Sequence, residues 1–219
     1  MTIEKEKYII ETDTLPVYLD ELLNHLDEKT EQITSFFQIT KYDTKIKIVI
    51  WDDLEKYKEH ISKYMEYRDY MCGDTCDGNI NILTLEEAHK EPPHKDMTLR
   101  ELKNVTAHEF VHICHRYVQQ GRKQDDYKDT WYYEVLATNL GNPDDFTLKY
   151  NEITHEKLLN FNKENNNYSM AYAIGRYMFE NYSEEEMLEF AKYPKKLALA
   201  AEEIIDGTMQ WLKTKINHK

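Results

Sequence analysis

The stretch Thr106-Ala107-His108-Glu109-Phe110-Val111-His112 is apolar, compatible with a helix, and contains the pattern His-Glu-x-x-His. Residues four apart lie on one face of an α-helix, so His108 and His112 can offer ring nitrogens to a single metal ion. The carboxylate of Glu109, the next residue along the helix, can then reach a water molecule on that ion. The pattern predicts a metal-binding helix and favours a zinc hydrolase acting on peptide bonds.

The flanks of this pattern are typical of a buried helix over residues 97–120. Thr98-Leu99-Arg100-Glu101 predicts a capping box, with Asp96 as an alternative N-cap, and Gly121 is a stop signal. A helix that is apolar on most sides is usually buried. The apolar positions here are Leu99, Leu102, Val105, Val111, Ile113, Cys114, Tyr117 and Val118. Buried imidazoles and a buried carboxylate need partners, and a metal ion would satisfy them.

A second apolar segment, Trp131-Tyr132-Tyr133-Glu134-Val135-Leu136-Ala137-Thr138, offers a third ligand. We expect a helix with Asp129 or Thr130 as N-cap, an end at Gly141-Asn142-Pro143, and Glu134 on its inner face. Two histidines and one glutamate leave a fourth zinc position open for water. That open position distinguishes a catalytic zinc site from a closed structural one.

The two segments together resemble the gluzincin branch of zinc peptidases, which includes thermolysin-like and peptidase MA-type domains. His108-Glu109-x-x-His112 is followed by Trp131-x-x-Glu134-x-x-Ala137, which is similar to the Trp-x-x-Glu-Gly-x-Ala pattern of that branch. The resemblance covers roughly Lys45 to Tyr182. It implies that His108, His112 and Glu134 bind Zn²⁺ and that Glu109 is the general base.

The chain departs from this family at two positions. Val135 stands where the pattern often has glycine, and Thr138 stands where thermolysin-like enzymes carry a carboxylate that supports a histidine ligand. Such supporting groups tune metal affinity, so the support must be weaker or come from elsewhere. The metzincin pattern is excluded, because His115 and Val118 occupy the positions of its glycine and third histidine. We interpret His115 as a helix histidine that is hydrogen-bonded at the edge of the core.

Gluzincins stabilise the oxyanion with a tyrosine or histidine from the helical lobe. By resemblance the first candidate is Tyr168, in Tyr168-Ser169-Met170-Ala171-Tyr172, and the alternatives are Tyr172 and His155. The chain has 17 tyrosines, so a packing role is the default interpretation for any one of them.

We expect one α+β domain over residues 1–219, with a small mixed sheet packed on the His-Glu-x-x-His helix and a mainly helical C-terminal lobe. Residues 1–142 would supply the sheet and active-site helices, and residues 143–219 the helical lobe. The patterns predict strands at 8–10, 45–50 and 78–84, and helices at 15–37, 52–68, 168–181, 183–191 and 194–215. By resemblance, residues 79–83 are an edge strand that holds the substrate backbone. The alternative is an interior strand.

Composition limits the partners. A net charge of −13 argues against nucleic acid. The N-terminus lacks the apolar core of a signal peptide and no run is long enough to span a membrane, so we expect a cytoplasmic protein. Cys114 is expected to be a buried thiol. Cys72 and Cys76 could form a metal half-site or a disulfide, but two free thiols in a loop are the favoured interpretation.

Three functions therefore stay in competition. The first is an active zinc peptidase on a peptide or protein substrate, cleaving as an endopeptidase or on short peptides. The second is a weak or inactive gluzincin-like zinc domain that acts as a sensor or protein-binding module. The third is a metal-free helical interaction protein with a chance pattern. The sequence indicates no oligomeric state.

Overall fold

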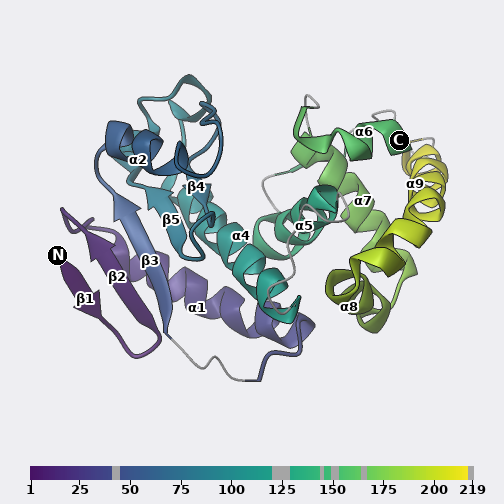
Figure 1. Ribbon diagram of the computed structural model, residues 1–219, viewed down its shortest axis with the longest axis horizontal. Coiled ribbons are helices and arrows are strands. Elements are labelled where there is room, and N and C mark those ends of the chain that lie inside the picture. The colour runs from purple at the N-terminus through teal and green to yellow at the C-terminus, as the bar shows by residue number, and fades with distance from the viewer. Residues whose placement is uncertain (41–44, 120–128, 144–145, 149–152, 164–166, 217–219) are drawn as a thin grey trace. The chain divides into compact units, whose positions relative to one another are not determined.

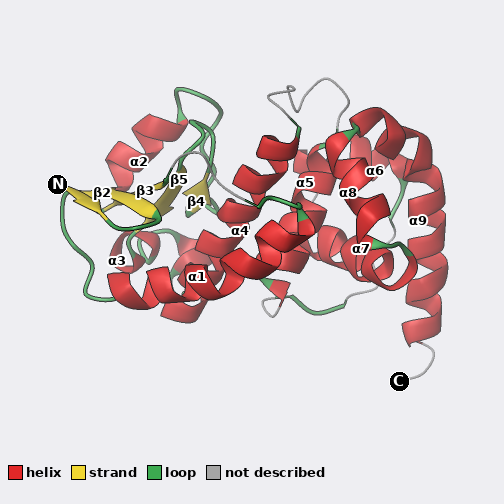
Figure 2. Cartoon of the chain, turned by 90° about the horizontal axis from the view of Figure 1, so that it is seen from below, coloured by secondary structure: helices red, strands yellow, loops and turns green. Residues whose placement is uncertain are grey.

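The computed structural model of the 219-residue chain describes residues 1–40, 45–119, 129–143, 146–148, 153–163 and 167–216 (Figure 1). The chain divides into two compact units, Met1–Ile113 and Cys114–Lys219, and the division falls inside helix α4 (Leu99–Val118). The strands of the described residues all belong to the first unit, and the described elements of the second are helical (Figure 2). The predicted α+β class, with a mixed sheet followed by a helical C-terminal part, is confirmed.

The first unit is built on a five-stranded sheet with the order β1-β2-β3-β5-β4. Strands β2, β3 and β5 run parallel, with Ile48 opposite both Ile10 and Ile80, whereas β1 and β4 are antiparallel edge strands. The predicted alternation in β3 is confirmed, since Ile46, Ile48 and Ile50 are buried and the residues between them are half-buried. The strand bounds are β1 (Thr2–Glu4), β2 (Tyr8–Thr12), β3 (Ile46–Trp51), β4 (Gly73–Asp74) and β5 (Ile80–Leu83).

Strand β5 lies inside the sheet, and all four of its side chains are buried. The prediction that residues 79–83 form the edge strand is therefore wrong, and the interior alternative is confirmed. Asn81 is tolerated inside because it accepts a hydrogen bond from Trp51 Nε1 (3.1 Å) and donates one to Asp77 Oδ1 (2.9 Å). The edge strand on this side is β4, in the segment predicted to be a loop. Its two residues are too few for an alternating pattern to show.

Helices α1 (Leu19–Phe36) and α2 (Leu54–Ile61) lie on opposite sides of the sheet (Figure 2). The buried side of α1 repeats with helical spacing, as predicted: Leu19, Leu22, Leu23, Leu26, Ile33 and Phe36. The predicted cap of α2 is also confirmed, because the Asp53 carboxylate accepts hydrogen bonds from the backbone of Glu55 and Lys56. The helix ends at Ile61, however, rather than near Arg68. Two short elements, α3 (Leu85–Ala88) and η1 (Pro92–His94), lead to α4.

The start of α4 is the predicted capping box. The backbone N–H of Thr98 donates to Glu101 Oε2 (2.7 Å), and the backbone N–H of Glu101 donates to Thr98 Oγ1 (3.3 Å). The middle of the helix is buried on most sides, as its composition predicts: Leu102, Thr106, Ala107, Phe110 and Val111 have no exposed surface. The predicted stop at Gly121 lies outside the described residues.

In the second unit, α5 (Thr130–Leu136) continues into the π-helix η3 (Ala137–Gly141), which matches the predicted second helix. The three helices predicted after it are confirmed as α7 (Asn167–Asn181), α8 (Glu184–Lys192) and α9 (Pro194–Ile216). The short elements α6 (His155–Leu159) and η5 (Phe161–Lys163) precede them. None of the described helices is both long enough and apolar enough to cross a membrane.

Candidate metal centre

His108 and His112 form a close pair of rings on α4. Their Nε2 atoms are 3.2 Å apart, and their exposed fractions are 6% and 8%. Two nitrogens that bind the same tetrahedral zinc ion, each at about 2.0–2.1 Å, lie about 3.3–3.4 Å apart. The pair therefore fits two ligands of one zinc ion without rearrangement. A hydrogen bond from one ring to the other is the alternative at this distance.

Glu109 is buried beside the edge strand of the sheet. Its exposed fraction is 7%, and the backbone of Gly73 in β4 approaches it closely. A Cβ atom added at Gly73 would lie 3.1 Å from Glu109 Cγ, 3.2 Å from Glu109 Oε1 and 2.7 Å from Val105 Cγ1. Only a residue without a side chain fits here, and it brings an edge-strand backbone directly against the carboxylate.

The ionisable neighbours of Glu109 in the first unit are held neutral. Burial first, and then the charge of Glu109, raise the pKa of the Cys72 thiol to about 12. Burial also raises the pKa of Tyr57, and the charges of Asp74 and Glu109 add to that shift. The thiol and the phenol therefore stay neutral beside the carboxylate. The two imidazoles of this part of α4 fit the chemistry that zinc prefers, and the carboxylate of Glu109 follows the first of them in the helix.

Glu134 is carried on a helix, as predicted. It is half-buried, whereas Trp131, Tyr132, Tyr133, Val135 and Leu136 of the same helix are buried. Its carboxylate thus lies on the side of α5 that the core of its own unit leaves open. Since Glu134 belongs to the second unit and the two histidines to the first, its role as third zinc ligand stays a prediction.

Thr138 is buried and bonded within its own helix. Its hydroxyl donates to the carbonyl oxygens of Glu134 (2.6 Å) and Val135 (3.3 Å), and the amide of Asn139 donates to the hydroxyl at 3.2 Å. The position where thermolysin-like enzymes have a supporting carboxylate therefore holds a hydroxyl directed at its own backbone. This turn is the π-helix η3, an irregularity that often occurs at functional sites.

The three oxyanion candidates also belong to the second unit. Tyr168 and Tyr172, on successive turns of α7, are half-buried, and their ring centroids lie 6.4 Å and 5.9 Å from that of Phe146. His155 is exposed at the first residue of α6. The aromatic contacts support the packing interpretation of both tyrosines. The choice of Tyr168 as the oxyanion donor stays a prediction.

His115 lies inside the core of the second unit, so the prediction that it sits at the core edge is wrong. It has no exposed surface, and its ring stacks on Tyr133 with centroids 3.9 Å apart and planes at 13°. Burial lowers its pKa to about 3, although a hydrogen bond with the Ala191 backbone opposes the shift. The uncharged ring is a packing residue, which supports leaving it out of the ligand set.

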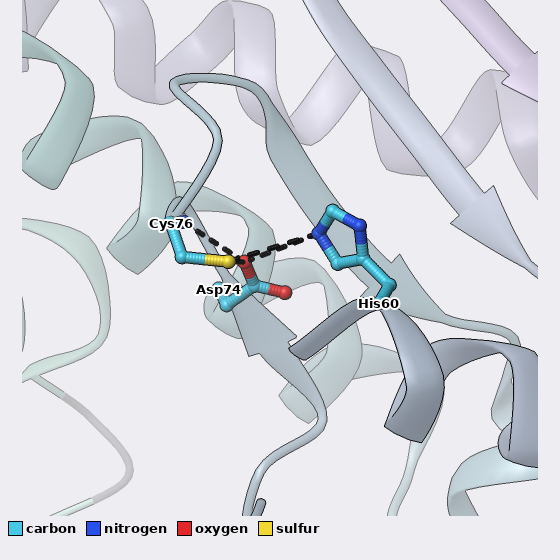
Figure 3. A group of neighbouring side chains, drawn as sticks. All are labelled: His60, Asp74 and Cys76. Atoms are coloured by element: carbon cyan, nitrogen blue, oxygen red, sulfur yellow. Dashed lines mark hydrogen bonds and ion pairs between the residues drawn. The ribbon is translucent and has the colours of Figure 1, made fainter. Parts of the chain in front are cut away.

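The three cysteines all lie in the described residues and are free thiols, so the disulfide alternative for Cys72 and Cys76 is wrong. Cys114 is buried, as predicted. Cys76, however, is not an isolated loop thiol, because His60 and Asp74 lie beside it (Figure 3). Sequence analysis missed these two neighbours. Asp74 and Cys76 are two residues apart, so the sequence could have suggested that pair. His60 is separated from them by the end of α2 and a loop, so no local spacing pointed to it.

Comparison of the chain with protein-family models, with curated proteins and with solved structures finds no match. The assignment of this centre therefore depends on its own residues and geometry.

Proposed function

We propose that the protein is a zinc-dependent hydrolase of peptide bonds. One observation carries the proposal: a buried helix holds the Nε2 atoms of His108 and His112 3.2 Å apart, with the buried carboxylate of Glu109 next to His108. The resemblance to gluzincins supports zinc over other cations and peptides over other substrates.

Each residue has a distinct role in this proposal. His108, His112 and Glu134 would hold the zinc ion, which when bound acts as a Lewis acid and lowers the pKa of water. Glu109 accepts a proton from the attacking water and delivers it to the leaving amine. Tyr168 is the first candidate to donate a hydrogen bond to the oxyanion, with Tyr172 and His155 as alternatives.

The edge strand β4 gives the substrate a place beside the general base. An extended peptide can add to an exposed sheet edge through main-chain hydrogen bonds. Because Gly73 of β4 lies against Glu109, a peptide aligned on this edge would pass close to the carboxylate. This role, which the sequence suggested for residues 79–83, therefore moves to β4.

A second candidate function follows from Thr138. Its hydroxyl is bonded to its own helix, so the carboxylate support expected in a thermolysin-like enzyme is absent at this position. Weaker support would lower metal affinity, on the order of 10–100-fold by analogy with other second-sphere groups. Such a domain would bind zinc and a protein partner with little or no hydrolysis.

The test compares two isosteric variants of the same helix. Glu109→Gln should abolish cleavage of a peptide library and leave the zinc content unchanged, because the base is lost and the ligands are not. Glu101→Gln is the matched control, because glutamine also completes a capping box. It should retain both activity and zinc.

Three results would count against the proposal. Activity retained in Glu109→Gln would refute the general-base role. A zinc-loaded protein that cleaves nothing but captures a partner would favour the sensor or binding module. Metal analysis that finds no stoichiometric zinc would favour the metal-free interaction protein.

A further inference from the structure

His60, Asp74 and Cys76 bring one nitrogen, one oxygen and one sulfur donor together in the first unit, and none of them belongs to the His-Glu-x-x-His pattern (Figure 3). Cys76 Sγ lies 3.7 Å from His60 Nε2 and 2.8 Å from Asp74 Oδ1. Asp74 Oδ1 lies 3.9 Å from His60 Nε2. The three donor atoms thus form a triangle whose short side joins the sulfur to the carboxylate (Figure 3).

Each of the three side chains is held in place by its own element. The ring of His60, in the last turn of α2, lies between Trp51 and Tyr64, with centroid distances of 5.1 Å and 5.4 Å. Asp74 is paired with Asn81 in the sheet, and the backbone N–H of Cys76 donates to Asp74 Oδ1 at 2.9 Å. The cluster is therefore organised before any ligand binds.

Asp74 carries an unsatisfied atom. Its exposed fraction is 7%, and its Oδ2 is buried without a hydrogen bond of normal geometry among the described residues, although the buried Tyr57 hydroxyl interacts with this carboxylate. Buried polar atoms of native proteins nearly always have a partner, and a bound cation can be that partner for a carboxylate oxygen. Asp74 Oδ1 faces Cys76 and His60, so a cation held there would also partner Oδ2 if the carboxylate bound it through both oxygens.

We propose that His60, Asp74 and Cys76 form a second metal site that binds a zinc-type divalent cation. Thiolate and imidazole ligands select zinc over magnesium and calcium, which prefer all-oxygen sites. The ligand separations expected around tetrahedral zinc are about 3.6 Å for sulfur to nitrogen, 3.4 Å for nitrogen to oxygen and 3.6 Å for sulfur to oxygen. The first two agree with the observed 3.7 Å and 3.9 Å to within about half an ångström.

The third separation differs for a chemical reason. The observed 2.8 Å between Cys76 Sγ and Asp74 Oδ1 is a hydrogen bond from the thiol. When a cation takes the place of that proton, the two atoms move apart by less than about 1 Å to reach zinc geometry. Cys76 lies in a turn rather than in a strand or helix, so a movement of this size is local.

The electrostatics of the cluster agree with the geometry. Burial raises the pKa of the Asp74 carboxyl, although hydrogen bonds from Cys76 oppose the shift. Burial, followed by the hydrogen bond to Asp74, raises the pKa of the Cys76 thiol. A divalent cation offsets the cost of charge on both groups. Asp77, whose Oδ2 lies 4.0 Å from His60 Nε2, is the nearest candidate for a fourth ligand.

The proposed site would join α2 to the edge strand β4. Asp74 follows Gly73 in that strand, and Gly73 is the residue that contacts Glu109. A cation at the second site therefore has a structural role, because it fixes the backbone beside the general base. The site shares no ligand with the first centre, so a test of this metal site does not depend on whether the proposed hydrolase function is correct.

Cobalt titration of the wild-type, full-length protein tests the site. Co²⁺ bound to a thiolate gives a sulfur-to-metal charge-transfer absorption in the near ultraviolet, and the ligands proposed for the first centre contain no sulfur. At saturation, we expect the amplitude of this absorption to correspond to one thiolate-bound Co²⁺ ion per chain. The absorption should disappear when Zn²⁺ is added. Zn²⁺ should also slow alkylation of Cys76 at least about tenfold in the unmodified chain, a readout that needs no variant.

Variants identify the ligands. Cys76→Ser should remove the absorption, whereas the neighbouring Cys72→Ser should retain it. Asp74→Asn keeps the shape and the acceptor oxygen but loses the charge, and should weaken Co²⁺ binding by more than the roughly 10- to 100-fold typical of supporting groups. A wild-type protein without the absorption, an absorption that survives in Cys76→Ser, or alkylation of Cys76 unaffected by Zn²⁺ would each overturn the proposal.

Discussion

The contact between Gly73 and α4 gives the sharpest prediction. In Gly73→Ala, the new methyl group would lie 2.7 Å from Val105 Cγ1 and 3.1 Å from Glu109 Cγ. Carbon atoms in contact normally lie about 3.5–4.0 Å apart, so the first contact is short by roughly 1 Å. Val105 cannot easily turn away, because valine in a helix has one strongly preferred rotamer. We expect a loss of about 1–3 kcal/mol in the free energy of unfolding.

The same substitution should reduce catalysis separately from stability. Its methyl group would lie 3.2 Å from Glu109 Oε1, so the carboxylate must shift. A catalytic group misplaced by about 1 Å can cost on the order of 100-fold in rate. Urea unfolding measures the first effect and peptide hydrolysis the second, at a temperature where the variant is fully folded.

A double variant separates the two contacts. Val105→Ala removes the nearest methyl, so Gly73→Ala combined with Val105→Ala should recover part of the lost stability while hydrolysis stays low. Val105→Ala alone is the control. If Gly73→Ala unfolds at the wild-type urea concentration and cleaves at the wild-type rate, the close approach of β4 to Glu109 is refuted. The unfolding measurement remains decisive even if the protein hydrolyses nothing.

Three further predictions concern stability. Thr98→Ala should cost about 1 kcal/mol in urea unfolding by breaking the cap with Glu101, and Thr98→Ser should not. Gly175→Ala would place a Cβ in overlap with the side-chain amide of Asn139 and should cost about 1–3 kcal/mol; an unchanged unfolding midpoint would contradict this packing. His115, with its pKa lowered from 6.5 to about 3, takes up its proton at higher pH in the unfolded chain. Stability should therefore fall as pH drops from 6.5 towards 3, by up to about 1.4 kcal/mol per unit, and His115→Leu should flatten that slope.

The elements with a regular pattern could be predicted from the sequence. The alternating isoleucines of β3, the helical repeat of α1 and the capping box of α4 were all predicted within a few residues. Strands β1 and β4 were missed because two or three residues cannot show a period. The sequence pattern also did not predict the order of the strands. Ile80-Asn81-Ile82 alternates like a strand with one exposed face, but Asn81 is buried and hydrogen-bonded inside the sheet.

The two candidate metal sites differ in how much the sequence reveals. His108 and His112 lie on one helix, where a spacing of four residues fixes their geometry. The ligands of the second site come from α2, β4 and a turn, and no single period relates them. Cys72 and Cys76 suggested a metal half-site in the sequence. The third ligand, His60, is distant in sequence and lies near Cys76 only in the folded chain. A site assembled across several elements leaves no local pattern, so only the folded structure reveals it.

Strand β4 connects the two sites through the geometry of an extended chain. Successive side chains of a strand point to opposite faces, so a residue there that packs on one helix leaves its neighbour facing the other way. Gly73 packs on α4 beside Glu109, and Asp74 reaches towards His60 at the end of α2. A two-residue edge strand has few hydrogen bonds to hold it, and edge strands fray more readily than interior ones. A cation bound between α2 and β4 would add a further restraint to this short strand, at the backbone that contacts the general base.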